Sequence, residues 1–172
     1  MTQPSPTVTI RKAEEKDYPF ILKLNKENVE VLAPMNEAII RNFAEIAELF
    51  LVAEVDGIPA AFLIALREGQ TYGSENYRWF SAHYAHFLYV DRIVIDASFR
   101  KAGLGRALYA AVREHAEIIG SPLVCAEIDT EPVYNEASLR FHAAMGFREV
   151  GTQYVRNGAV RVSLQVLELR RE

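Results

Sequence analysis

Cysteine is nearly absent from this sequence, because Cys125 is the one cysteine among its 172 residues. A single thiol excludes an internal disulfide and any zinc cluster built from several cysteines. One cysteine is compatible with a reducing compartment. The first residues, MTQPSPT, lack the basic and apolar regions of a secretory signal peptide. We therefore expect a cytoplasmic protein.

Long apolar runs and an excess of positive charge are also missing. No run approaches the roughly 18 residues that a membrane-spanning helix needs. The formal net charge is -4 at pH 7, whereas a general nucleic-acid-binding protein is usually basic. We therefore expect neither a membrane nor a nucleic acid as partner. What remains is an ordinary globular composition, 50% hydrophobic and 24% charged.

Strand and helix patterns alternate along the chain without a repeat or an interdomain linker. We expect residues 1–6 to be a flexible lead and residues 7–170 to form one domain. The predicted strands are 7–13, 49–55, 58–66, 87–95, 123–129, 147–155 and 159–169, and the predicted helices are 16–32, 36–47, 103–119 and 135–145. Residues 67–86 are expected to be a long polar and aromatic connection. The order β-α-α-β-β-β-α-β-α-β-β predicts an α/β fold, with a mixed central sheet and helices on both faces.

Several local signals support these elements. Asp17 and Asn36 are placed to cap the first two helices. The dipeptides Asp56-Gly57 and Asn157-Gly158 predict tight hairpin turns. The apolar face of the first helix is predicted to contain Ile21, Leu22, Leu24 and Val29.

The most specific stretch is RKAGLGRALY, residues 100–109. Two glycines one residue apart stand behind an arginine and a lysine, directly before an apolar helical pattern. Glycine lets the backbone approach a ligand closely, and a helix start offers unpaired N–H groups and a partial positive charge. This combination predicts an anion site, most often for a phosphate.

Three readings of this turn compete on the residues alone. A P-loop is disfavoured, because Gly105 is followed by Arg106 and Ala107 rather than by Lys and Ser or Thr. A dinucleotide fingerprint is met at Gly103 and Gly105 but not at Leu108, and its position after an antiparallel hairpin speaks against it. Glu127, about 20 residues further on, speaks for it. A helix start that binds no ligand is the third reading.

Two motifs together resemble the GNAT superfamily of N-acetyltransferases. In IVIDASFRKAGLGRAL, Arg100, Gly103 and Gly105 occupy the positions of the family's phosphate-binding signature, which directly follows an apolar strand. Further on, the second motif matches at Asn135, Ser138, His142 and Gly146-Phe147. The element order agrees over residues 7–168. Lys101 departs from the pattern, because many members have glycine there.

The resemblance implies a fold, a co-substrate and its contacts. It implies acetyl-CoA as the co-substrate and no metal, with the pyrophosphate held by backbone N–H groups of residues 101–106 and the pantetheine arm on the preceding strand. The implied acceptor is an amine of a small molecule or a peptide. The cofactor contacts implied are Ile93, Val94, Ile95, Arg100, Lys101, Ala102, Gly103, Leu104, Gly105, Arg106 and Asn135, and the side chains of Ile93 and Ile95 are expected in the core.

Acetyl transfer needs a base for the amine and a proton for the departing thiolate. Glu127 interrupts the apolar strand LVCAEID, and similar enzymes use a glutamate there as base; the alternative is a glutamate at the wet end of the strand. Asp91 is the second candidate, although a structural ion pair or a turn cap is the more ordinary role for it. His142 stands where many members place a proton-donating tyrosine, and the alternative is a packed histidine. Cys125 is expected in the core.

The segment 72–89 is rich in aromatic side chains: Tyr72, Tyr77, Trp79, Phe80, Tyr84, Phe87 and Tyr89. We interpret it as a lid or an acceptor wall, as core, or as a homodimer contact. A metal site at His83 and His86 is disfavoured, because no carboxylate or cysteine ligand follows at a useful spacing. The function expected is acetyl-CoA-dependent N-acetyl transfer to an amine. The alternatives are a non-catalytic acyl-CoA-binding sensor or regulatory protein and a dinucleotide-binding protein.

Overall fold

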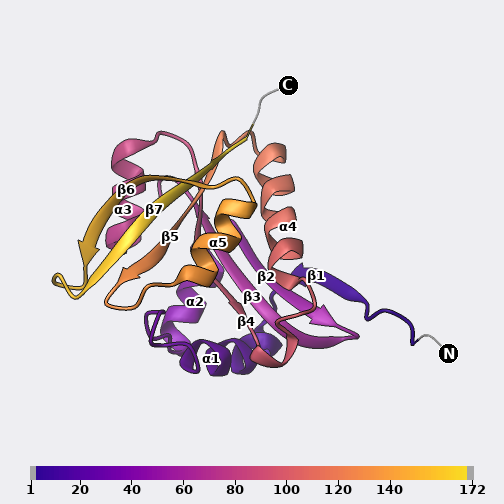
Figure 1. The fold of residues 1–172 in the computed structure, drawn as a ribbon. Helices are drawn as coiled ribbons and strands as arrows, with labels where there is room; N and C mark the ends of the chain where they lie inside the picture. Colours follow the sequence, from indigo (N-terminus) through magenta and orange to yellow (C-terminus); the bar gives the residue numbers. More distant parts are fainter. Residues whose placement is uncertain (1–2, 170–172) are drawn as a thin grey trace. The chain divides into compact units, whose positions relative to one another are not determined.

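The computed structural model describes residues 3–169 and contains a seven-stranded mixed sheet (Figure 1). Its strands follow the order β1-β2-β3-β4-β5-β7-β6, which confirms the predicted α/β class. Two compact units make up the described chain. The first runs to Ala65 and includes Arg92–Val112, and the second combines Leu66–Asp91 with the chain from Arg113 onward. Residues 1–2 of the predicted lead and residue 170 of the predicted domain lie outside the described residues.

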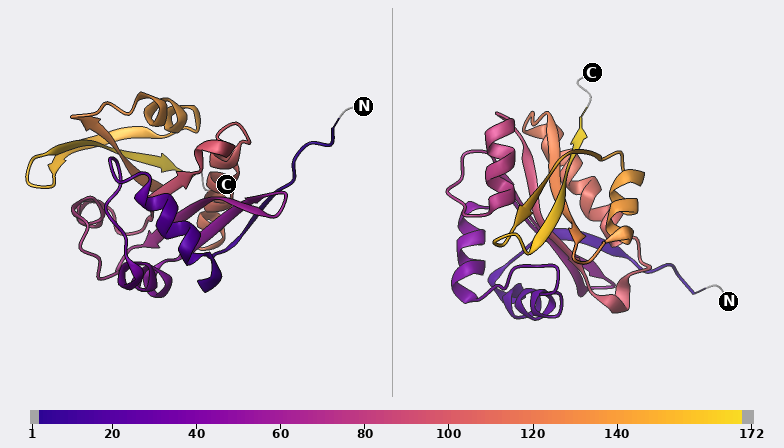
Figure 2. Two further views of the ribbon diagram at one scale, coloured as in Figure 1. Left: turned by 90° about the horizontal axis from the view of Figure 1, so that it is seen from below. Right: turned by 60° about the vertical axis from the view of Figure 1, so that its left-hand side comes forward.

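The first unit contains the N-terminal half of the fold. Its elements are β1 (Val8–Lys12), a 3-10 turn (Glu15–Asp17), α1 (Tyr18–Lys26), α2 (Glu37–Ile46), β2 (Leu49–Val55), most of β3 (Ile58–Arg67), the second half of β4 (Leu88–Ile95), a second 3-10 turn (Ala97–Phe99) and the first part of α4 (Leu104–Ile118). β1, β2 and β3 pair antiparallel in sequence order. The two N-terminal helices α1 and α2 lie side by side (Figures 1 and 2).

Local signals in this unit are met in part. Asp56 and Gly57 both have positive φ, 49° and 79°, and join β2 to β3 as predicted. The Asn36 side chain accepts a hydrogen bond from the Ile39 N–H at 2.9 Å, which confirms the predicted cap. The predicted cap at Asp17 is wrong: its carboxylate is buried and accepts two hydrogen bonds from the Arg11 guanidinium, at 2.7 and 2.8 Å.

The first helix is also shorter than predicted. α1 ends at Lys26 rather than at residue 32. Ile21 and Leu24 are buried as expected, but Val29 lies beyond the helix and is 43% exposed. Turn-forming residues 27–32 follow α1 instead, and their N–H groups bond back to nearby carbonyls, as from Val31 to Asn28.

The second unit is built around an antiparallel three-stranded layer. Its elements are α3 (Glu75–His83), the first half of β4, the last part of α4, β5 (Leu123–Glu131), α5 (Glu136–Ala144), β6 (Arg148–Val155) and β7 (Val160–Glu168). β7 pairs antiparallel with both β5 and β6, and β4 pairs parallel with β5. The predicted hairpin over Asn157-Gly158 is confirmed. Its two strands are the orange-to-yellow pair at the C-terminal end of the colour range in Figure 2.

A helix that the sequence analysis missed lies in the segment predicted as a connection. α3 begins after Ser74, whose hydroxyl accepts a hydrogen bond from the Tyr77 N–H at 3.3 Å. Its buried side chains are Asn76, Tyr77 and Phe80. Tyr77 packs edge-on against Tyr89, with ring centroids 5.6 Å apart. The inner aromatic residues of segment 72–89 are therefore core of this unit, since Tyr77, Phe80, Phe87 and Tyr89 are buried.

None of the helices within residues 3–169 is both long enough and apolar enough to cross a bilayer.

Candidate active site

Glu127 on β5 is the centre of a polar cluster in the second unit. Its Oε1 accepts a hydrogen bond from the Tyr89 hydroxyl at 3.0 Å. Its Oε2 is buried and has no hydrogen-bond partner of ordinary geometry among the described residues. The residue as a whole is only half-buried, whereas this oxygen is shielded from water. A carboxylate oxygen without a donor is well suited to accept a proton.

The surroundings of Glu127 favour its protonated form. Burial and, next, the negative charge of Asp91 raise the pKa of Glu127 to about 8, while the Tyr89 hydroxyl and the Asn76 side chain oppose this rise. Burial acts because it removes the water that would stabilise the carboxylate. A base with a pKa near the operating pH combines a useful ionised fraction with real proton affinity.

Asp91 and Glu127 hold equivalent places on two parallel strands. The register of β4 and β5 pairs Leu88 with Val124 and Tyr89 with Cys125. Asp91 lies two residues after Tyr89, and Glu127 lies two residues after Cys125. Because residues two apart on a strand share a face, Asp91 and Glu127 lie on the same face of the sheet as Tyr89 and Cys125. Tyr72 donates a hydrogen bond to Asp91, so a tyrosine hydroxyl is one of the partners of Asp91. Each carboxylate thus has a tyrosine donor.

Sequence analysis missed the contribution of α3 to this cluster. The buried Asn76 side chain on α3 accepts a hydrogen bond from Gln153 Nε2 at 2.9 Å through Oδ1. One signal was available in the sequence: Asn76 lies next to Tyr77 and four residues before Phe80, a spacing that places the three on one helix face. A polar residue on a buried face needs partners.

His142 contacts Ser138 one turn earlier on its own helix. The ring is buried, and Nδ1 lies 2.7 Å from the Ser138 carbonyl oxygen. The ring also packs edge-on against Phe147, with centroids 5.1 Å apart. Burial lowers the pKa of His142, although the hydrogen bond to Ser138 favours the charged form. Since a carbonyl can only accept, Nδ1 carries the hydrogen and Nε2 is the nitrogen able to exchange a proton.

Asn135 and Cys125 take the positions expected from the sequence. The Asn135 side chain caps α5 by accepting a hydrogen bond from the Ser138 N–H at 3.2 Å. The Cys125 thiol is fully buried, which raises its pKa well above the ordinary value. Cys125 is therefore a core residue, as predicted, and a poor nucleophile.

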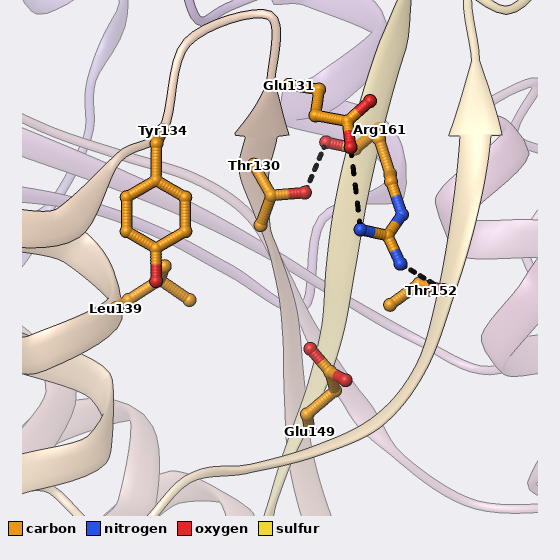
Figure 3. A pocket seen from close by; sticks show the side chains of 7 residues that line it. All are labelled: Thr130, Glu131, Tyr134, Leu139, Glu149, Thr152 and Arg161. Carbon is orange, nitrogen blue, oxygen red and sulfur yellow. Dashed lines mark hydrogen bonds and ion pairs between the residues drawn. The ribbon is translucent and has the colours of Figure 1, made fainter.

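A separate polar cavity opens at the far end of β5 (Figure 3). Its volume is about 380 Å³. Arg161 crosses it, with its guanidinium 3.6 Å from Glu131 and 3.4 Å from the Thr152 hydroxyl. The lining residues are Thr130, Glu131, Tyr134, Leu139, Glu149, Thr152 and Arg161. This cavity contains none of the residues predicted to be catalytic.

In the first unit, the glycine-rich turn forms the start of α4. Gly103 has φ +74°, which a side chain rarely tolerates, and its carbonyl accepts the first helical hydrogen bond, from the Ala107 N–H at 3.1 Å. The N–H groups of Leu104, Gly105 and Arg106 therefore have no acceptor within the helix. The Ala102 N–H is already donated to the Phe99 carbonyl at 3.0 Å.

The cations and the strand beside this turn are partly accessible. Arg100, Lys101 and Arg106 are all exposed. On the second half of β4, Val94 is buried, but Ile93 and Ile95 are half-buried. The expectation that Ile93 and Ile95 lie in the core is therefore wrong, because alternate residues of this strand face a less covered side.

The two histidines of the aromatic segment have other partners. His83 stacks on Trp79 with ring centroids 3.7 Å apart, and His86 Nδ1 lies 3.2 Å from Glu68. Within residues 3–169, no group of three or more histidine, cysteine or acidic side chains is arranged to hold a metal ion.

The family of this chain follows from comparison with known proteins. A family model described as the acetyltransferase (GNAT) family matches residues 9–147. This match covers most of the chain, and the chain therefore belongs to the GNAT family of acetyltransferases. No curated protein sequence matches it.

Solved structures share the fold at low sequence identity. The ribosomal-protein-S18-alanine N-acetyltransferase from Escherichia coli is 19% identical, with a TM-score of 0.71 and 96% of each chain covered. The Salmonella typhimurium protein yncA, solved with its cofactor acetyl-CoA, is 20% identical, with a TM-score of 0.66 and coverage of 96% of this chain and 95% of that one. Arabidopsis thaliana Naa50, in complex with the bisubstrate analogue CoA-Ac-MVNAL, is 16% identical, with a TM-score of 0.70 and coverage of 94% and 99%.

Proposed function

We propose that this protein is an acetyl-CoA-dependent N-acetyltransferase that transfers the acetyl group directly to an amine. The observation that carries the proposal is the buried, unpartnered Oε2 of Glu127, whose carboxylate has a pKa raised to about 8. Membership of the GNAT family supports the reaction class. Direct transfer is proposed because the buried Cys125 is not available to carry the acetyl group.

Glu127 is the proposed general base. An aliphatic amine is mostly protonated at neutral pH and must lose a proton before its nitrogen attacks a carbonyl carbon. Oε2 of Glu127 takes that proton, and the Tyr89 hydroxyl holds the other oxygen. The negative charge of Asp91 increases the proton affinity of Glu127 and favours an approaching ammonium group.

The glycine-rich turn is the proposed site for the pyrophosphate of coenzyme A. The free N–H groups of Leu104, Gly105 and Arg106 fit an anion at the start of α4, and the exposed Arg100 and Lys101 add charge. The backbone of Ile93–Ile95 and the side chain of Asn135 are the proposed contacts of the pantetheine arm. Acetyl-CoA would supply the acetyl group as an activated thioester.

His142 is the proposed proton donor to the departing sulfur. Its Nδ1 hydrogen stays with the Ser138 carbonyl, so the proton given away must leave from Nε2. Only the protonated ring has a hydrogen there in this arrangement. Because burial lowers the pKa of His142, the charged ring is scarce at neutral pH, and this assignment carries a specific pH signature.

The acceptor is proposed to be a small-molecule or peptide amine. The Escherichia coli relative is named for an alanine of a ribosomal protein, and the Arabidopsis thaliana relative was solved with a CoA–peptide analogue. Both names support a peptide N-terminus as the first acceptor to try. A cytoplasmic location is part of the proposal, in line with the single cysteine.

Ligand binding and turnover test the proposal in two steps. Acetyl-CoA should raise the melting temperature, whereas NAD should not; the reverse result would support the dinucleotide alternative. A thiol-release assay with a panel of amines and peptide N-termini should then detect turnover. Glu127→Gln should lower that rate by about 10- to 1000-fold without weakening acetyl-CoA binding. Binding without turnover on any acceptor would support the alternative of a non-catalytic sensor.

A further inference from the structure

Two β-bulges flank the polar cavity at the end of β5 (Figure 3). β5 has one extra residue, Thr130, between its pairs with β7, and β6 has one extra residue, Val150, between its own pairs with β7. Thr130 and its neighbour Glu131 line the cavity from one side, and Glu149 lines it from the other. A bulge bends its strand and re-aims side chains, and bulges are common next to functional sites. Both interruptions of the sheet therefore meet at one cavity.

A buried hydrogen-bond chain holds the Glu149 carboxylate in place. Gln165 Nε2 on β7 donates to Ser163 Oγ at 3.0 Å, and the Ser163 hydroxyl donates to Glu149 Oε2 at 2.6 Å. Ser163 is fully buried, and Gln165 is 6% exposed. Burial of polar groups is costly unless they are hydrogen-bonded, and a satisfied chain of such groups makes its members rigid. The chain ends in a residue that is itself exposed, so a rigid core feature positions a carboxylate at the surface.

The other two charges of the cavity lining offset each other. The Arg161 guanidinium lies 3.6 Å from the Glu131 carboxylate. Glu131 also accepts a hydrogen bond from the Tyr154 hydroxyl at 3.0 Å. Since the lining contains one arginine and two glutamates, it has one formal negative charge in excess. That charge belongs to Glu149, because Arg161 balances Glu131 and the serine that holds Glu149 is neutral.

An aromatic and an aliphatic side chain complete the lining. Tyr134, which is 65% exposed, precedes α5, and Leu139 belongs to α5. Figure 3 shows the Glu149 carboxylate directed toward the space between Tyr134 and Arg161. An aromatic ring can add a cation–π contact to the attraction of a carboxylate. The cavity volume of about 380 Å³ lies within the range of roughly 300–1,000 Å³ that is usual for small-molecule sites.

We propose that this cavity binds an organic cation, with its ammonium group at Glu149 and its alkyl arm against Leu139 and Tyr134. Ser163 occupies Oε2 of Glu149, so the ammonium donates to Oε1. Such a charge-assisted hydrogen bond is stronger than one between neutral groups. The buried chain keeps the carboxylate oriented before the cation arrives, which lowers the entropy cost of binding.

This cation site lies on the other face of the sheet from Glu127. Along β5, Glu127 pairs with Leu164, and the next residue, Ile128, pairs with Ser163. Because successive residues of a strand point to opposite faces, Ser163 and the carboxylate that it holds lie across the sheet from Glu127. The inference therefore goes beyond the proposed function, and it requires neither acetyl-CoA nor turnover.

An NMR titration with n-butylammonium at constant ionic strength tests the cation site. In ¹⁵N-labelled protein, the backbone resonances of residues 149–152 and 161–163 should shift in a saturable way. Butan-1-ol, which has the same alkyl arm without the charge, should bind at least about tenfold more weakly, because a hydrogen bond between charged groups is lost. Butyrate should not bind, because its charge is repelled by Glu149. Equal affinities of n-butylammonium and butan-1-ol would overturn the proposal, as would the absence of a saturable shift at these residues.

Glu149→Gln provides the decisive variant, because it keeps an acceptor for Ser163 and removes the charge. It should weaken n-butylammonium binding at least about tenfold. Glu114→Gln is the matched control: it removes the same charge from an exposed position on α4, outside the lining, and should leave the affinity unchanged. Equal affinity in Glu149→Gln and the wild type would overturn the site.

The proposed acceptor site is a second place where an amine can bind, and Glu127→Gln separates the two. Shifts at residues 149–152 and 161–163 should remain in Glu127→Gln and disappear in Glu149→Gln. If they disappear in Glu127→Gln instead, the cation binds at the proposed active site and the cavity proposal is overturned alone. If no amine is acetylated while these shifts remain, the proposed function fails and the cation site stands.

Discussion

Gly151 lies directly against the ring of Trp79, and a Cβ at this glycine would come within 2.7 Å of the ring atom Cζ2. The glycine stands at an irregularity of the β6–β7 register, between Glu149 and Gly151. Trp79 belongs to α3, so this contact joins the helix to the hairpin. It explains why β6 has glycine at a position where a strand would ordinarily use a larger residue.

Gly151→Ala should destabilise the protein by about 1–3 kcal/mol, because the indole ring or the strand must move to admit a methyl group. Urea unfolding followed by circular dichroism measures this change. Gly73→Ala is the matched control, since nothing lies within 4 Å of a Cβ there, and its effect should stay within about 0.5 kcal/mol. Equal stabilities of the two variants would contradict the contact.

The sequence indicated most elements because their signals are local. Asp56-Gly57 and Asn157-Gly158 determine tight turns through their own backbone preferences, and the structure has both. α3 was missed because its buried face includes Asn76, and one polar residue in a short helix weakens the apolar period. Asp17 was assigned to a cap because the helix-start pattern does not show that Arg11, six residues earlier on β1, folds back to bind its carboxylate.

The candidate site could be predicted only in part, for the same reason. Glu127 was noticeable as an acid within an apolar strand, and the glycine-rich turn is a contiguous motif. Tyr89 and Asp91 meet Glu127 only through the parallel register of β4 and β5. Gln153 reaches Asn76 across 77 positions of sequence. A single sequence contains no information on such long-range registers beyond what face patterns imply.

Gly103→Val should weaken binding of coenzyme A at least about tenfold, if the turn holds the pyrophosphate. The φ of +74° at this glycine is unfavourable for a β-branched residue, so the turn would change shape. Gly57→Val provides the control, because Gly57 has a similar φ of +79° in a hairpin turn and should lose stability without losing affinity. Calorimetric titration of both folded variants gives the comparison, and unchanged affinity in Gly103→Val would remove the phosphate site.

Salt should weaken coenzyme A binding if Arg100, Lys101 and Arg106 contact its phosphates, because added ions screen these exposed charges. Replacing each by glutamine should reduce both the affinity and its dependence on ionic strength. Dephospho-CoA should bind more weakly if one of the three reaches the 3′-phosphate. Arg113→Gln is a suitable control, since Arg113 pairs with Glu117 further along α4. Binding that does not respond to salt would leave the backbone N–H groups as the sole phosphate contacts.

The raised pKa of Glu127 predicts a pH-dependent cost to stability. Its pKa is about 8 in the folded state and 4.5 in the reference state, so between these values the folded protein binds more protons than the unfolded one. Stability contributed by this group is therefore complete below about pH 4.5 and is lost as the pH rises toward 8. Glu127→Gln removes the ionisation and should be more stable than the wild type at pH 8, with the difference narrowing toward pH 5. Chemical unfolding at both pH values measures it; a difference that is constant with pH would contradict the raised pKa.

The role of His142 can be separated from simple packing by the pH at which its replacement matters. As a donor, the ring must be protonated at Nε2, and burial lowers the pKa that governs this form. The charged fraction therefore falls as the pH rises, and the wild type should exceed His142→Phe by more at about pH 6 than at about pH 8. The ionisation of Glu127 affects the rates of both proteins alike, so its effect cancels in the ratio of these rates.

His142→Gln adds a second comparison, because its amide can still donate to the Ser138 carbonyl but cannot deliver a proton. It should resemble His142→Phe in rate and stay closer to the wild type in melting temperature. Acetyl-CoA binding should remain nearly intact in both variants. A rate ratio that does not change with pH, together with a large loss of melting temperature in His142→Phe, would assign His142 to the core and leave the departing thiolate to be protonated by water.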